Sequence, residues 1–82
     1  MLEKIEQCAE RTWHALGKAG ELNVLRLSEH IEERSVVTYQ ALGWLAREGK
    51  IRYGLKGNQV YVSLTEEEQA RFDRINGKGE NG

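Results

Sequence analysis

The sequence predicts one α+β domain, with a core of three helices, a short first strand, a β-hairpin and a short C-terminal helix. Two patterns lead to this prediction: apolar residues at helical spacing in three segments, and strict alternation over residues 51–64. The chain has 82 residues, enough for one hydrophobic core. It is 39% hydrophobic and 30% charged, as expected for a folded globular protein.

Residues 2–18 are expected to form an amphipathic first helix. Its apolar residues recur at three- and four-residue steps, namely Leu2, Ile5, Ala9, Trp13 and Leu16. Cys8, the only cysteine, is expected to be a small core residue rather than a nucleophile. Gly20 is the stronger of the two glycine signals for the end of this helix.

A brief extended segment at residues 21–24 and a second helix over residues 25–33 should follow, with Leu27 and Ile31 as its buried pair. Ser35 is the expected N-cap of a third helix over residues 36–48. The turn between these helices, Glu32-Glu33-Arg34-Ser35, contains no glycine. It instead contains two acidic residues, Glu32 and Glu33.

The clearest local pattern is a hairpin. Gly57-Asn58 stands between two alternating segments and predicts a two-residue turn. That turn pairs Leu55 with Val60, Tyr53 with Val62 and Ile51 with Leu64, so that all six side chains share one face. Tyr53 is therefore expected in the core. The opposite face carries Arg52, Gly54, Lys56, Gln59, Tyr61 and Ser63.

Thr65-Glu66-Glu67-Glu68 is a capping box and predicts a final helix to about Ile75. Ala70 and either Phe72 or Ile75 are expected to dock it on the core. Residues 1–75 then form the domain, and residues 76–82 are expected to be a flexible tail because they have nothing to bury.

This order of elements is that of a winged helix-turn-helix. The segment from Ala41 to Ile51, Ala-Leu-Gly-Trp-Leu-Ala-Arg-Glu-Gly-Lys-Ile, resembles a recognition helix leading into its wing. Together with Thr12-Trp13 and the segment Val60–Thr65, it resembles a family of very short prokaryotic winged helix-turn-helix proteins of unknown function. The resemblance covers residues 1 to about 70 and implies, by architecture, a DNA-binding module.

The net charge is −1, but residues 36–64 carry four bases against Glu48 alone, a local balance of +3. In a DNA-binding interpretation the third helix would enter the major groove and the wing would contact phosphates. The two acids of the turn before this helix would then lie beside the DNA-facing surface. Gln40 suits adenine, and Arg47 suits guanine or phosphate. The candidate nucleic-acid-binding residues are Val37, Tyr39, Gln40, Gly43, Arg47, Arg52 and Lys56.

The alternative is a protein-interaction or homodimerisation module with no direct DNA contact. The third helix is apolar beyond a single face, and its anchors would be Val36, Val37, Tyr39 and Trp44. Two simpler interpretations stay open: Trp44 packs in the core, and the bases are solvated surface charges.

Several classes of function find no support in the sequence. His14, His30 and Cys8 have no metal-ligand spacing, and neither a nucleophile arrangement nor a phosphate loop is present. We therefore expect no catalytic residues, metal, cofactor or small-molecule substrate. No segment has the apolar length of a membrane span or the pattern of a signal peptide, so a cytoplasmic location is expected.

Overall fold

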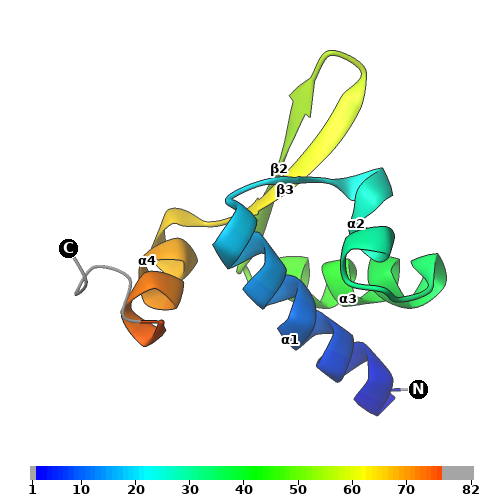
Figure 1. Cartoon of the computed structure of the whole chain (residues 1–82), viewed down its shortest axis with the longest axis horizontal. Helices are drawn as coiled ribbons and strands as arrows, with labels where there is room; N and C mark the ends of the chain where they lie inside the picture. The colour runs from blue at the N-terminus through cyan, green and yellow to red at the C-terminus, as the bar shows by residue number, and fades with distance from the viewer. Residues whose placement is uncertain (1, 77–82) are drawn as a thin grey trace.

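The computed structural model describes residues 2–76. Its elements in chain order are α1 (Leu2–Ala19), β1 (Leu22–Asn23), α2 (Val24–His30), α3 (Ser35–Arg47), β2 (Ile51–Lys56), β3 (Gln59–Leu64) and α4 (Glu66–Ile75). The strands form an antiparallel sheet in the order β1-β3-β2 (Figure 1). This is a winged helix-turn-helix. Residues 77–82 of the expected tail lie outside the described part of the chain.

The core lies where α1 packs across α3 and where the sheet closes over them. From α1 it receives Ile5, Cys8, Ala9 and Leu16, as the apolar spacing predicts, and Trp13 packs partly buried at its edge. Leu2 is 59% exposed, because the first turn of α1 contributes no residue to the core. Leu27 and Ile31 are both buried, as expected of the second helix.

The turn after α2 differs from the prediction. The helix ends at His30 rather than residue 33, and the backbone N–H of Glu33 donates to the Ser28 carbonyl at 2.9 Å. The N–H of Glu32 donates to the Glu29 carbonyl at 3.2 Å, which completes a Schellman motif. Glu32 occupies the left-handed position of this motif, with φ 57°. The turn therefore has the usual backbone geometry with a glutamate where glycine is favoured.

Replacing Glu32 by glycine is expected to stabilise the domain by about 0.5–1 kcal/mol. A residue with a Cβ is destabilised by roughly 1–2 kcal/mol in this conformation. The greater conformational freedom of glycine in the unfolded chain offsets part of the stability that the substitution gains. Urea unfolding of the two proteins measures the difference. Glu29→Gly, inside α2, is the control and should cost about 1 kcal/mol. A midpoint for Glu32→Gly at or below that of the parent would contradict the prediction.

The prediction that Ser35 caps α3 is wrong. The helix begins at Ser35, and its N-cap is Arg34, whose side chain makes no capping hydrogen bond. Ser35 Oγ lies 3.3 Å from Ser28 Oγ instead. The helix starts one residue earlier than the pattern suggested, so Ser35 lies inside it.

The hairpin register is confirmed at every pair: Leu55 with Val60, Tyr53 with Val62 and Ile51 with Leu64. Only the base of this face belongs to the core. Ile51, Val62 and Leu64 are buried, whereas Tyr53, Leu55 and Val60 are 49%, 75% and 40% exposed. The expectation that Tyr53 is a core residue is therefore wrong, because the outer half of the hairpin projects beyond the helices (Figure 1).

The N-cap of α4 is confirmed by a hydrogen bond of 3.3 Å from the Glu68 N–H to Thr65 Oγ1. The second bond of a capping box does not form, because the Thr65 N–H donates to the Lys50 carbonyl at 3.1 Å and the Glu68 carboxylate accepts from Trp13 Nε1. Phe72 alone buries α4 on the core, and Ala70 and Ile75 are exposed. The Phe72 ring lies directly on Gly17 of α1, where an added Cβ would stand 2.3 Å from ring atom Cδ1. Glycine at this position is what lets α4 approach α1.

Candidate nucleic-acid interface

The outer surface of α3 is one continuous stripe of exposed residues. Inward-facing positions along the helix are filled by Val37, Thr38, Ala41, Leu42 and Leu45, all of which are buried. Five of the exposed residues recur at steps of three and four, namely Val36, Tyr39, Gln40, Gly43 and Arg47, and Ser35 and Ala46 are exposed beside them. The helix contains no acidic residue over its whole length. We call this set of five residues the outer stripe.

Val37 has no exposed surface, so it is a core residue that neither DNA nor a protein partner can contact. Its neighbours in sequence, Val36 and Thr38, lie on the outside and inside of the helix respectively. Val37 lies off the main apolar stripe of the sequence pattern, which left open whether the third helix is buried on more than one side or presents these residues to a partner. In the structure α3 is covered by α1, by α2 and by the base of the sheet.

Gly43 stands in the middle of the outer stripe and has open space in front of it. A Cβ built there meets no atom within 4 Å, and its φ is not in the left-handed region. Neither packing nor backbone geometry of the domain therefore requires glycine here. A glycine inside a helix costs about 0.5–1 kcal/mol relative to alanine, so a close approach by a partner is a physical reason for it.

The candidate bases differ in their surroundings. Arg47 and Arg52 are exposed and have no ion pair within residues 2–76. Lys56 is paired with Glu21 at 2.5 Å and lies 5.2 Å from the centre of the Tyr61 ring. The hydrogen bond to Glu21 raises the pKa of Lys56, so Lys56 stays protonated, and the Glu21 carboxylate partly compensates its positive charge. Sequence reasoning missed Glu21, which lies 35 residues away in the chain.

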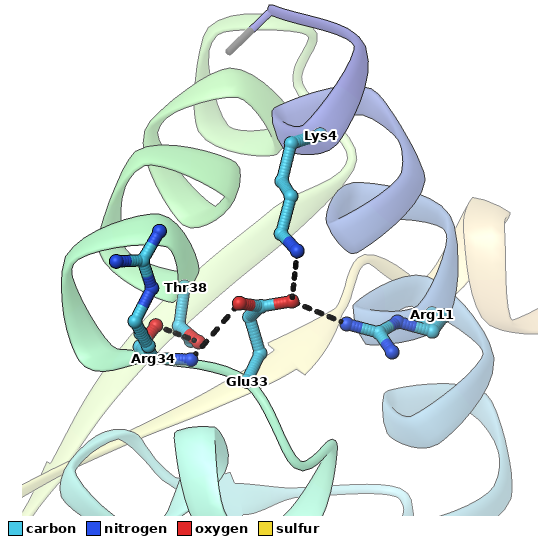
Figure 2. Close-up of polar contacts among 5 residues, drawn as sticks. All are labelled: Lys4, Arg11, Glu33, Arg34 and Thr38. Carbon is cyan, nitrogen blue, oxygen red and sulfur yellow. Dashed lines mark hydrogen bonds and ion pairs between the residues drawn. The ribbon is translucent and has the colours of Figure 1, made fainter.

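Arg34 is a further base that sequence reasoning missed. It is exposed at the N-terminal end of α3, and Figure 2 shows its guanidinium turned away from the polar contacts of Glu33. Thr38 Oγ1 donates to the Arg34 carbonyl at 3.0 Å and holds the backbone here. The outer stripe thus has a base near each end, Arg34 at one and Arg47 at the other.

Glu33 does not border the outer stripe as the sequence suggested. Its carboxylate turns toward α1, where Oε1 lies 2.9 Å from Arg11 Nη2 and 3.8 Å from Lys4 Nζ (Figure 2). Oε2 accepts a hydrogen bond of 3.0 Å from the Arg34 backbone N–H. This N–H, with Lys4 and Arg11, lowers the pKa of Glu33. One of the two acids expected beside the DNA-facing surface is therefore engaged elsewhere.

The lowered pKa of Glu33 predicts a loss of stability in acid. A carboxyl group whose pKa is lower in the folded chain stabilises the fold above its unfolded pKa of about 4.3. That contribution disappears as the pH falls through the folded value. Glu33→Gln should therefore be less stable than the parent at pH 7, and the difference should shrink below about pH 4. Thermal unfolding between about pH 3 and pH 7 tests this.

Glu32→Gln is the control for that experiment, because Glu32 lies beside Glu33 in the same turn, is exposed and makes no ion pair within the described residues. Its stability difference from the parent should stay near zero across the same pH range. Equal pH dependence of the two variants would contradict the role given to Glu33.

The structure does not bring the four predicted protein-interface residues together. Val36 and Tyr39 are 54% and 46% exposed on the outer stripe. Trp44 is partly buried against the core and lines a groove formed with α1 and α4, and Val37 is buried. Packing against the core, the simpler interpretation for Trp44, is confirmed.

Metal-ligating clusters and membrane-spanning helices are both absent from residues 2–76. This part of the chain contains no group of three or more His, Cys, Asp or Glu side chains placed to hold a metal ion. None of its helices has the length and apolar character needed to cross a bilayer.

Comparison with known proteins supports the fold. The model of a family described as Winged helix-turn-helix domain (DUF2582) matches residues 2–64. Among solved structures, the chain is similar to the crystal structure of the AntR antimony-specific transcriptional repressor, with a TM-score of 0.63 and 21% identity. That similarity covers 88% of this chain and 68% of the other. No curated protein matches the chain.

Proposed function

We propose that this chain, which belongs to the DUF2582 family of winged helix-turn-helix domains, binds double-stranded DNA through the outer stripe of α3 and the wing. The observation that carries the proposal is the character of that stripe. It is exposed, free of acids, flanked by Arg34 and Arg47, and contains a glycine that packing within the domain does not require. Winged helices are typically non-catalytic, which agrees with a recognition role.

The side chains of the outer stripe suggest how DNA would be contacted. Gln40 has the amide that pairs with adenine in the major groove, and Val36 and Tyr39 offer apolar contact to thymine methyl groups. Arg34, Arg47 and Arg52 would meet phosphates and set the orientation of the domain. Lys56 would first exchange Glu21 for a phosphate, a small cost because exposed ion pairs are weak.

The small number of basic side chains on this surface predicts weak, salt-sensitive DNA binding by a single domain. Removing one base that binds a phosphate should make the slope of log K against log salt shallower by about 0.9. The similarity to AntR, itself a transcriptional repressor, supports the proposal only through the shared fold, because the two sequences are 21% identical.

The test is a titration of the ¹⁵N-labelled chain with a mixed-sequence duplex in about 20 mM and about 150 mM salt, followed by amide shifts. The largest shifts are expected in α3 and the wing, and they should weaken at the higher salt. Arg47→Ala should lower the affinity about three- to tenfold. Lys18→Ala, an exposed base on α1, is the matched control and should change little. An absence of shifts in α3 at low salt would overturn the proposal.

Homodimerisation through the same stripe is the second candidate, favoured by the exposed apolar side chains of Val36 and Tyr39. A stable interface buries about 800 Å² on each partner, and two side chains supply only part of that. Sedimentation equilibrium up to millimolar protein tests it. A monomer throughout, or a dimer that Tyr39→Ser leaves intact, would exclude this candidate.

A further inference from the structure

A groove of about 610 Å³ opens between α1, the C-terminal end of α3 and α4. Ala9 and Leu45, both buried, belong to its lining, and Trp13 and Trp44 stand in its walls. These are the only two tryptophans in the chain. Trp44 lies off the outer stripe of α3, so the groove is separate from the surface proposed to bind DNA.

The groove is acidic. Its lining includes four carboxylates and two bases, which gives a net charge of −2 with His14 neutral. Lys50 is paired with Glu48 at 3.3 Å, and Glu68 accepts a hydrogen bond of 2.8 Å from Trp13 Nε1. Glu6 and Glu10 have no hydrogen bond or ion pair from their side chains within residues 2–76.

Glu6 and Glu10 are also four residues apart on α1, so they lie one above the other at the mouth of the groove. Like charges at this spacing disfavour the helix. Arg71 of α4 also lines the groove, but it makes no ion pair with either carboxylate. Trp13 follows on the same side of α1, with its ring held by the bond to Glu68 and by edge contact with Phe72 at 5.4 Å between centroids. Two unpaired carboxylates thus lie beside the Trp13 indole, whose orientation is held by these contacts.

We propose that this groove binds an organic cation with a bulky aromatic or alkyl body. A cation beside Glu6 and Glu10 would relieve their repulsion, and indole is the strongest partner among the aromatic rings for a cation. The volume lies in the range of ligand-binding clefts, about 300–1,000 Å³. A second copy of the chain fits this groove poorly, because a two-fold contact would bring its carboxylates against their own equivalents.

The sequence indicated no small-molecule partner, since the lining comes from three segments that show no binding motif separately. The proposal does not depend on DNA binding. Either can fail without the other, because the groove and the outer stripe use different residues.

Intrinsic fluorescence gives a direct test, because both tryptophans line the groove. Tetraphenylphosphonium should change the tryptophan emission in a saturable way. Tetraphenylborate, of nearly the same size and shape but with a negative charge, should not. Glu6→Gln with Glu10→Gln should weaken cation binding roughly 2- to 30-fold, since each removes one exposed opposite-charge interaction.

Glu21→Gln with Glu29→Gln is the control, because it removes the same charge from exposed residues next to β1 and in α2, outside the groove lining. It should leave the cation affinity within about twofold, as expected when only distant, screened charges change. Amide shifts confined to α1, the end of α3 and α4 would confirm the site independently. The proposal is overturned if the two probes respond equally, if no saturable change occurs, or if the two double variants lose affinity to the same extent.

Discussion

Replacing Gly43 by leucine is expected to weaken duplex binding at least tenfold while making the free domain more stable. Leucine is a good helix former, so the gain is about 0.5–1 kcal/mol over glycine inside α3. Its side chain enters open space in the isolated domain, since a Cβ at residue 43 meets no atom within 4 Å. In a complex it would hold the helix away from base edges at the centre of the outer stripe. Gly43→Ala should show a smaller loss of binding in the same direction.

The value of this substitution is that folding and binding move in opposite directions. Urea unfolding measures the stability of the free domain, and fluorescence anisotropy with a labelled duplex at low salt measures the affinity for DNA. Ala70→Leu, at an exposed position on α4, is the control and should bind like the parent. Unchanged affinity in Gly43→Leu would show that nothing approaches this part of α3 closely, and it would remove the glycine from the argument for DNA binding.

Gly17→Ala is expected to destabilise the domain by about 2–3 kcal/mol, the cost of overpacking a filled core site. The added Cβ would lie 2.3 Å, 2.4 Å and 2.6 Å from Cδ1, Cγ and Cε1 of the Phe72 ring. Phe72 is only 3% exposed, so its ring has little room to yield, and Cγ moves only if the side chain or α4 itself moves. The clash must therefore shift α4 away from α1.

A double-mutant cycle gives this prediction its control. Phe72→Ala alone should cost about 3–5 kcal/mol by removing a buried aromatic ring. In the Phe72→Ala background, Gly17→Ala should become stabilising by about 0.5–1 kcal/mol, because the clash is gone and only the helix propensity remains. Urea unfolding of the four proteins measures the coupling. A destabilising Gly17→Ala in both backgrounds would show that something other than the Phe72 ring excludes the methyl group.

Features that depend on residues close together in the sequence were predictable from the sequence alone. The hairpin register followed from the Gly57-Asn58 turn and the period of two in the flanking strands, and all three predicted pairs form. The capping hydrogen bond of Thr65 followed from its spacing to Glu68. The element order, and with it the winged helix-turn-helix fold, was recoverable because each element carries its own periodicity and end signals.

Only tertiary packing decided which side chains of each helix and strand are buried, paired or exposed. Val37 and Tyr53 both belong to apolar patterns, yet Val37 is fully buried and Tyr53 is half exposed. The side of α3 that carries Val37 packs against the rest of the domain, whereas the helices stop short of the hairpin tip. Glu33 and Lys56 found partners 22 and 35 residues away, at Arg11 and Glu21. Local spacing determines which side chains share a face, but the long-range contacts between elements determine whether that face meets the core, another charge or solvent. The sequence by itself therefore determined the fold of this chain, while the tertiary structure alone decided which residues of α3 are open to binding and assembled the groove of Trp13 and Trp44.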